Sequence, residues 1–345
     1  MARRSSTEAP GKAPAWTASP TVADVSPEDL LGMYASMVLT RVLDERWWAL
    51  NRQGKAAIAV PSQGHEATHV AAVWAMRRVP SAAYFPNYRD LGVMVALGVS
   101  PRELLLSFMA KAGETFSGAR QFPFHGARPD LKVFNLSSVV ATQLPHAVGY
   151  ALGCKLSGDP TVTLTLFGEG ASSQGDFHEA LNFASIHRLS VIFLCENNRY
   201  AISVPQSKQM AIESVADRAA GYGIPGVAVD GTDVLKTYQA VAEAVELATS
   251  GGGPTLIEAK VERLMPHTSD DDDKRYRSAQ ELQEAKKRDP LPKFAAYLKA
   301  QGLLTDQEEQ RILIQARHEV DQATQEAEAA PYPDAATLGD HVYGS

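Results

Sequence analysis

The sequence predicts an α/β protein built on a doubly wound parallel sheet flanked by helices, with helical N- and C-terminal extensions. Two observations indicate the sheet. From about Val133 short apolar runs begin to alternate with segments of helical periodicity, and a repeated strand, helix, strand order is typical of parallel sheets covered on both faces. A third observation indicates the extensions, because helical patterns dominate before Val133 and again beyond Ala279.

The N-terminal part is expected to be helical over 26–130, after a tail over 1–25 that is rich in Arg, Ser, Ala and Pro and is predicted to be disordered. Ser26 is a typical N-cap and Pro27 a typical first helical residue, and apolar residues then recur at helical spacing up to Gly54. Two further helical segments are expected at 64–76 and 101–112, separated by the loop YFPNYRDLG at 84–92.

The parallel-sheet core is expected over 131–265 within one overall domain. Its expected strands are 161–167, 190–196, 225–229 and 254–262, and the expected helices between them are 174–187, 212–222 and 233–249. A loop over 266–278 follows the last strand. Ligands of such sheets bind beyond the carboxyl ends of the strands, so this edge is where a site is expected.

The C-terminal extension, 279–345, is predicted to be helical, with breaks at Pro290, Pro292 and Gly302. Five apolar residues trace one face of its last helix: Ile312, Ala316, Val320, Ala323 and Ala327. This face is expected either to pack on the core or to dock on another subunit, and the sequence does not distinguish the two.

Composition narrows the class of protein. The chain has 345 residues, 45% of them hydrophobic, which is enough for a full core. The net charge of −7, without a dense Lys/Arg stretch, argues against a nucleic-acid partner. No apolar run has the length of about 20 residues that spans a bilayer, so no membrane association is expected. With only Cys154 and Cys195, both in apolar segments, a disulfide framework is excluded and a cytoplasmic location is expected.

Oxygen-bearing side chains follow two successive expected strands. Glu169 ends the first, inside Gly-Glu-Gly, and Asn198 ends the next, 29 positions later. One strand, helix, strand unit takes about 30 residues, so both should emerge side by side at one edge of the sheet. A carboxylate, an amide oxygen and a nearby main-chain carbonyl suit Mg²⁺, which usually completes its octahedron with water and substrate phosphates. The following helix N-terminus, with Gly168, Gly170 and Gly175 allowing close approach, would help to hold a phosphate.

Two other function classes fit parts of this pattern. A dinucleotide-binding dehydrogenase would use G-x-G before a helix and Glu196 as the ribose-binding acid, but Ser173 stands where a third glycine is required. A noncatalytic scaffold subunit is the other class, suggested by the long C-terminal helices.

The segment HEATH, His65 to His69, satisfies H-E-x-x-H, the pattern of zinc peptidases. A catalytic zinc needs a third protein ligand, and none is evident on an adjoining helix. Two helix-surface or cap histidines are therefore favoured over a metal site.

A series of motifs resembles the α subunit of the decarboxylating, thiamine-diphosphate-dependent component of 2-oxo acid dehydrogenase complexes. The motifs, in order, are QGHEA at 63–67, NYRD at 87–90, GARQFPFH at 118–125, SSVVATQLPHAVG at 137–149, GEGASSQGDFHEALNFA at 168–184, ENNRYAIS at 196–203, GIPGVAVDGTDVL at 223–235, PHTSDDDDKRYR at 266–277 and KRDPLPKF at 287–294. The branched-chain members are the most similar in pattern, and the resemblance implies the thiamine-diphosphate-binding fold.

The resemblance also implies roles for particular residues. Glu169, Asn198 and the Tyr200 carbonyl would hold Mg²⁺, with Gly168, Gly170 and Ala171 against the diphosphate. Tyr88, Arg89 and His267 would approach the cofactor, and His267, in what would be the active-site loop, would also face the reacting centre as the catalytic residue. Ser138 and Val140 would lie against the middle of the cofactor, and Ser137, Thr142 and Gln143 would hold a monovalent cation such as K⁺.

The implied activity is oxidative decarboxylation of branched-chain 2-oxo acids, with pyruvate or acetoin as alternative substrates, and transfer of the acyl group to lipoyl on the acyltransferase core. The implied assembly is an α2β2 heterotetramer, because the glutamate that activates the cofactor comes from a β subunit. Branched-chain relatives often carry Arg where Glu196 stands, so Arg199 is considered as its substitute. Phosphorylation at Thr268 or Ser269 is conceivable from their place in this loop.

Overall fold

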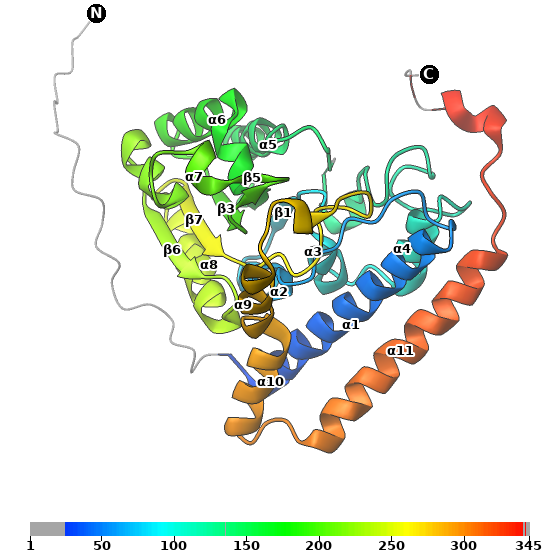
Figure 1. Ribbon diagram of the computed structural model, residues 1–345. Helices are drawn as coiled ribbons and strands as arrows, with labels where there is room; N and C mark the ends of the chain where they lie inside the picture. Colours follow the sequence, from blue (N-terminus) through cyan, green and yellow to red (C-terminus); the bar gives the residue numbers. More distant parts are fainter. Residues whose placement is uncertain (1–24, 135, 341, 343–345) are drawn as a thin grey trace, which may run out of the picture.

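The computed structural model describes residues 25–134, 136–340 and 342 (Figure 1). The tail expected over 1–25 therefore lies outside the described residues, except for its last position. None of the helices in the described part of the chain is both long and apolar enough to cross a membrane.

The centre of the fold is a parallel sheet of five strands in the order β1-β2-β3-β7-β6. The strands are β1 (Ala82–Phe85), β2 (Val162–Gly168), β3 (Val191–Asn197), β6 (Gly226–Asp230) and β7 (Thr255–Lys260). The four strands expected from the sequence are confirmed, and so is the α/β class with helices on both faces. A short antiparallel pair, β4 (Tyr200–Ala201) and β5 (Val204–Pro205), lies just beyond β3.

Strand β1 was not expected: Tyr84 and Phe85 fall at the start of the segment interpreted as a loop, 84–92, and Ala82 and Ala83 lie just before it. Strand β1 pairs in parallel with β2, with Ala82 opposite Val162. Four residues are too few to show a strand periodicity. The strand belongs to the sheet through its pairing with β2, and its residues Ala83 and Phe85 pack against Ala147 of helix α5 (Gln143–Ser157). One sheet strand thus comes from the part of the chain that was expected to be helical.

Helices cover both faces of the sheet. Those before and within it are α1 (Pro27–Arg52), α2 (Glu66–Met76), α3 (Leu91–Ala96), α4 (Pro101–Phe108), α5 (Gln143–Ser157), α6 (Gly175–Ile186), α7 (Gln206–Gln209) and α8 (Val234–Thr249), with single 3₁₀ turns at Pro129–Leu131 and Glu169–Ser173. The helix expected at 212–222 is instead a 3₁₀ helix over Val215–Tyr222, and α3 and α5 were not anticipated.

The two faces are covered by different helices because strand side chains alternate in direction. Leu164, Leu166 and Ile192 pack in one core with α1, α2 and α8. Phe167 and Phe193 point the other way, into a second core with α5 and α6. Both faces of β2 and β3 are therefore buried, and the ends of these strands are the places left for polar side chains.

The C-terminal layer consists of α9 (Ala279–Lys287), α10 (Pro290–Ala300), α11 (Asp306–Ala329) and short 3₁₀ turns at Asp273–Arg275 and Ala335–Gly339. The expected break at Pro292 is wrong, since this residue lies in the first turn of α10, where Pro is tolerated. Figure 1 shows α11 running alongside α1, and its face of Ile312, Ala316, Val320, Ala323 and Ala327 is buried there. Of the two alternatives that the sequence left open for this face, packing on the core is the one observed.

Candidate functional site

A cavity of about 210 Å³ opens at the carboxyl ends of β2 and β3. Its walls come from the start of α2, the loop between β1 and α3, the turn after β2, the segment after β3 and the loop after β7. Predicted site residues line it: Tyr88, Arg89, Val140, Gln143, Gly168, Glu169, Gly170, Ala171, Asn198, Tyr200 and His267. The fold thus brings together side chains that lie up to about 180 positions apart in the sequence.

Glu169 lies at the end of β2 with its side chain buried; the residue is 1% exposed. Its Oε2 accepts a hydrogen bond of 3.2 Å from the main-chain N–H of Asn198, and its Oε1 has no partner among the described residues. Burial raises the pKa of this carboxyl to about 7. An unpartnered buried carboxylate oxygen is unfavourable by itself, and a cation beside it would remove the penalty.

Asn198 faces Glu169 from the end of β3, as the sequence predicted. Its Oδ1 accepts a hydrogen bond of 3.2 Å from the N–H of Tyr200, which fixes the tight turn between β3 and β4. Arg199 in this turn and Ile202 in the following turn, between β4 and β5, adopt positive φ angles of 71° and 55°, a strained conformation for residues other than glycine and one often found at functional sites. Gly170 allows the turn to approach, because a Cβ there would lie 2.9 Å from Cβ of Ala201.

Arg89 and His267 contact each other across the cavity wall. One guanidinium N–H group of Arg89 donates to Nδ1 of His267 at 3.0 Å and to its carbonyl at 3.1 Å. Burial and the nearby Arg89 lower the pKa of His267 to about 3, so the ring is neutral at pH 7. Because arginine can only donate, Nδ1 of His267 must accept, and its proton resides on Nε2.

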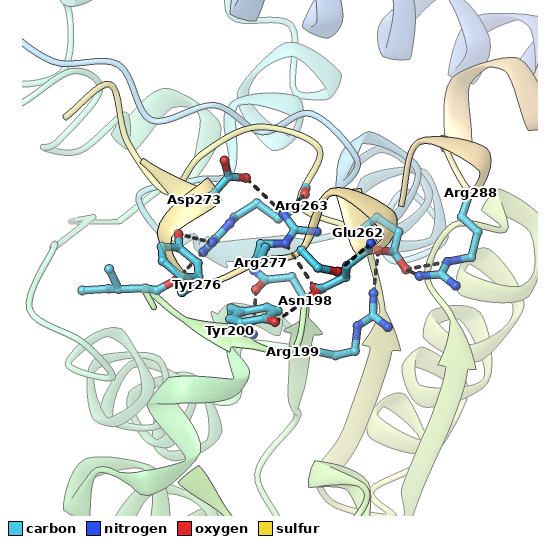
Figure 2. A network of polar contacts seen from close by, with 12 residues as sticks. Asn198, Arg199, Tyr200, Glu262, Arg263, Asp273, Tyr276, Arg277 and Arg288 are labelled. Atoms are coloured by element: carbon cyan, nitrogen blue, oxygen red, sulfur yellow. Dashed lines mark hydrogen bonds and ion pairs between the residues drawn. The ribbon is translucent and has the colours of Figure 1, made fainter. Parts of the chain in front are cut away.

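A network of polar contacts holds the loop that carries His267. The N–H of His267 donates to Asp271 at 2.8 Å, and the Tyr276 hydroxyl donates to the same carboxylate oxygen. Tyr276 in turn accepts from the buried Arg263 at 2.7 Å, and Arg277 donates to the Arg263 carbonyl, as Figure 2 shows. The loop at 266–278 is therefore tied to the end of β7 through side chains.

The segment expected to hold a monovalent cation contributes Val140 and Gln143 to the lining of the same cavity. The Ser137 hydroxyl accepts from the N–H of Val139, and the Thr142 hydroxyl donates to the Val139 carbonyl. Gln143 donates to the carbonyl of Leu166 at 2.8 Å, and its Oε1 is buried without a partner among the described residues. Ser138 is exposed and receives or donates a hydrogen bond of 2.7 Å with His125.

Two titratable residues that were not predicted as site residues also line the cavity: His65 and Glu196. His65 is the N-cap residue of α2, which agrees with the expectation of a cap histidine. The expectation of helix-surface histidines is wrong, because His65 and His69 are both at most 1% exposed. Nε2 of His69 lies 2.8 Å from a carboxylate oxygen of Glu196. Glu196 thus points inward rather than toward a ribose, which argues against the dinucleotide interpretation. The motif at 65–69 was the signal that could have pointed to these residues.

The donor set of the cavity fits a magnesium-bridged diphosphate. Glu169 offers a free carboxylate oxygen, Asn198 an amide oxygen on the neighbouring strand, and the N-terminus of α6 begins six residues after Glu169. The two side chains offer oxygen ligands of the kind Mg²⁺ prefers. The N–H groups at the N-terminus of α6 suit a phosphate, and Arg89 supplies a fixed positive charge.

Comparisons with known proteins agree with this geometry. Residues 34–336 match the family described as dehydrogenase E1 component. The 2-oxoisovalerate dehydrogenase subunit alpha of Bacillus subtilis is 49% identical over 316 residues, covering 92% of this chain and 96% of the relative. The 3-methyl-2-oxobutanoate dehydrogenase subunit alpha of Mycobacterium tuberculosis is 40% identical, with 86% and 77% covered.

A pyruvate dehydrogenase E1 component subunit alpha, from Staphylococcus epidermidis, is 38% identical over 323 residues, covering 93% of this chain and 84% of the relative. The family implies thiamine diphosphate as the cofactor. From the extent of these matches, the chain belongs to the dehydrogenase E1 component family.

Proposed function

We propose that this chain is the α subunit of a branched-chain 2-oxo acid dehydrogenase. The observation that carries the proposal is the pairing of Glu169 and Asn198 at one cavity, with a buried carboxylate oxygen that lacks a partner among the described residues. The relatives with 49% and 40% identity are named for 2-oxoisovalerate and 3-methyl-2-oxobutanoate, two names for one branched-chain 2-oxo acid.

In this proposal Glu169, Asn198 and the Tyr200 carbonyl hold Mg²⁺, and Arg89 and Tyr88 approach the diphosphate. Gly168, Gly170 and Ala171 lie against the diphosphate, and Ser138 and Val140 lie along the middle of the cofactor. Ser137, Thr142 and Gln143 hold a monovalent cation such as K⁺. When bound, thiamine diphosphate supplies the carbanion that attacks the 2-oxo group and the ring that accepts the electrons after loss of carbon dioxide.

His267 is the proposed catalytic residue of this chain. In the neutral ring Nδ1 accepts a hydrogen bond from Arg89. The Nε2–H group therefore remains available to donate to the substrate. A second cavity of about 210 Å³ shares Tyr88, Val140 and His267 with the first, and Trp47, Ile58 and Val60 add an apolar wall. This lining suits an apolar branched side chain better than a charged one.

The β partner, the α2β2 assembly and acylation of a lipoyl group on an acyltransferase core also belong to the proposal. The test is reconstitution: the α chain is assayed alone and with its β partner, using branched-chain 2-oxo acids, pyruvate and acetoin in parallel. We expect decarboxylation only in the mixture, with the branched-chain substrates preferred. Full activity of the α chain alone would refute the assembly.

Pyruvate or acetoin is the alternative substrate, and the relative named pyruvate dehydrogenase supports keeping the first in the panel. A preference for pyruvate over every branched-chain acid would make pyruvate the proposed substrate and would leave the proposed cofactor site unchanged.

His267→Ala tests the catalytic assignment. Because the ring is held by its loop and does not carry the fold, we expect turnover to fall by about 100-fold, within the range of general acid–base groups, while thiamine diphosphate binding changes little. A mutant tetramer that acylates lipoyl at the original rate would count against the role of His267.

A further inference from the structure

Beside the proposed cofactor cavity lies a cluster of buried groups that the proposed function does not use. His65, at the start of α2, and His69, one turn later, face Glu196 at the end of β3. Nε2 of His69 pairs with Oε1 of Glu196 at 2.8 Å. Both ring nitrogens of His65, Nδ1 of His69 and Oε2 of Glu196 are buried and have no hydrogen-bond partner among the described residues. So many unpartnered polar atoms in one place require a physical explanation.

The positions of these atoms are those of a ligand set. One ligand atom from each of His65, His69 and Glu196 can be chosen so that all three lie within 4.8 Å of one another. Zinc bonds of about 2.0–2.2 Å space tetrahedral ligands by about 3.4 Å, so small side-chain rotations bring the three atoms into range. Oδ1 of Asp90 lies 3.4 Å from Nε2 of His69, which places a further carboxylate beside these three residues.

The backbone around the cluster is rigid. Gly64, at φ 98°, lets the chain turn into α2 directly against β7, since a Cβ there would lie 2.0 Å from the Glu262 carbonyl. Glu66, which would be the general base of a zinc peptidase, accepts from Arg41 at 2.6 Å and from the N–H of Gly64 at 2.7 Å. It is therefore unavailable for catalysis, and the cluster is suited to a structural ion.

We propose that His65, His69 and Glu196 bind a divalent transition-metal ion, with zinc as the best match, and that Asp90 completes the set. Two imidazoles and carboxylates favour Zn²⁺ over Mg²⁺, which prefers oxygen ligands. Two neutral histidines, two carboxylates and one divalent ion sum to zero charge, which is the arrangement that costs least in a buried site. This ion would be separate from the Mg²⁺ proposed at Glu169 and Asn198.

The test is metal titration of the full chain, stripped with chelator and kept in excess Mg²⁺ so that oxygen-rich sites are filled. Zn²⁺ is added in competition with a chromophoric chelator, and Co²⁺ is used as a spectroscopic probe of nitrogen-containing coordination. We expect one tightly bound ion per chain. His65→Gln and Glu196→Gln should each weaken binding by more than about 100-fold, because even changes outside the ligand sphere cost about 10–100-fold.

His318→Gln, an exposed position on α11, is the matched control and should leave binding unchanged. Thermal unfolding gives a second readout: Zn²⁺ should raise the Tm of the wild-type chain and of the control, but not that of His65→Gln. The proposal is overturned if the folded wild-type chain binds no more zinc than His65→Gln, or if Zn²⁺ shifts the Tm of both equally. His69 and Glu196 would then be a simple buried ion pair.

Discussion

Two buried glutamates in this chain have the same exposure and opposite surroundings. Glu66, in the helical layer, is fully buried, and both of its oxygens are paired, one with Arg41 and one with the N–H of Gly64. Glu169, at the cavity, is 1% exposed and leaves one oxygen unpaired among the described residues. Burial alone therefore does not distinguish a structural carboxylate from a functional one. The two carboxylates differ in whether both oxygens have hydrogen-bond partners.

The ion pair and hydrogen bonds of Glu66 stabilise the packing of helices. Arg41 of α1 bonds Glu66 of α2 with its Nε and Asp289, the N-cap of α10, with both terminal nitrogens. Three helices are thus joined by one guanidinium. At the cavity, by contrast, the unpaired oxygen of Glu169 lies at the end of β2 in the lining of an open space, so a ligand can supply the missing partner.

The largest effect is expected for a substitution of Glu169 at the cavity, measured as cofactor affinity. Glu169→Gln keeps the shape of the side chain but removes the charge that would face Mg²⁺. We expect the affinity for thiamine diphosphate to fall by about 1000-fold, corresponding to ~4 kcal/mol for a buried charge interaction, with no loss of thermal stability. Calorimetric titration of the reconstituted tetramer measures this.

Glu179→Gln is the control for that experiment, because Glu179 is exposed on α6 and does not line the cavity. Unchanged cofactor binding in Glu169→Gln would show that the unpaired oxygen is not a metal ligand and would remove the distinction between the two glutamates.

Arg41→Ala is the corresponding change in the helical layer. It leaves Glu66 buried without its counter-charge, and removing one partner of a buried pair costs about 3–5 kcal/mol. We expect the free energy of unfolding to fall by that amount in urea titrations. If stability changed by less than about 1 kcal/mol, the pairing around Glu66 would not be what holds α1, α2 and α10 together.

The next prediction concerns how the free energy of unfolding depends on pH through Glu169. Burial raises the pKa of Glu169 to about 7, above its ordinary 4.5. The folded state then binds the proton more tightly than the unfolded state, so this stabilisation is fully present below pH 4.5 and is lost as the pH rises to 7. Without metal or cofactor, the difference in unfolding free energy between the wild type and Glu169→Gln should shift by about 3 kcal/mol over this window. A flat difference would place the Glu169 pKa at its ordinary value.

The smallest effect is expected at Arg199. Its side chain is 45% exposed, bonds Glu262 at 2.7 Å and lines a neighbouring cavity rather than the one with Glu169. Figure 2 shows it directed toward Glu262, which Arg288 also contacts. We expect Arg199→Ala to leave cofactor affinity within about twofold and stability within about 1 kcal/mol. A loss of cofactor affinity above tenfold would make Arg199 the phosphate contact that the sequence suggested.

Much of the architecture was predictable because its elements are long and strongly patterned. Strands β2 and β3 read as apolar runs that end in polar residues, and α1 carries its own N-cap, Ser26, which accepts from the N–H of Asp29. Strand β1 was missed because four residues show no period, and the helix at 212–222 was too short and polar to reveal its 3₁₀ geometry.

At the site, sequence spacing correctly placed Glu169 beside Asn198, since two parallel strands one crossover apart end at the same edge. It could not place Glu196 against His65 and His69, because that contact joins a strand to a helix about 130 positions earlier. The hydrogen bond between Arg89 and His267 likewise depends on how the loop after β7 folds back. Contacts of this kind follow from tertiary packing rather than from any local pattern.

The proposed function depends on Glu169 and Asn198 together holding a metal ion against a diphosphate. The most direct measurement is ³¹P NMR of thiamine diphosphate bound to the reconstituted tetramer, with Mn²⁺ in place of Mg²⁺. We expect strong paramagnetic broadening of both phosphorus resonances in the wild type and its loss in Asn198→Ala. Bound cofactor with sharp resonances in the wild type, or equal broadening in both proteins, would contradict this proposal.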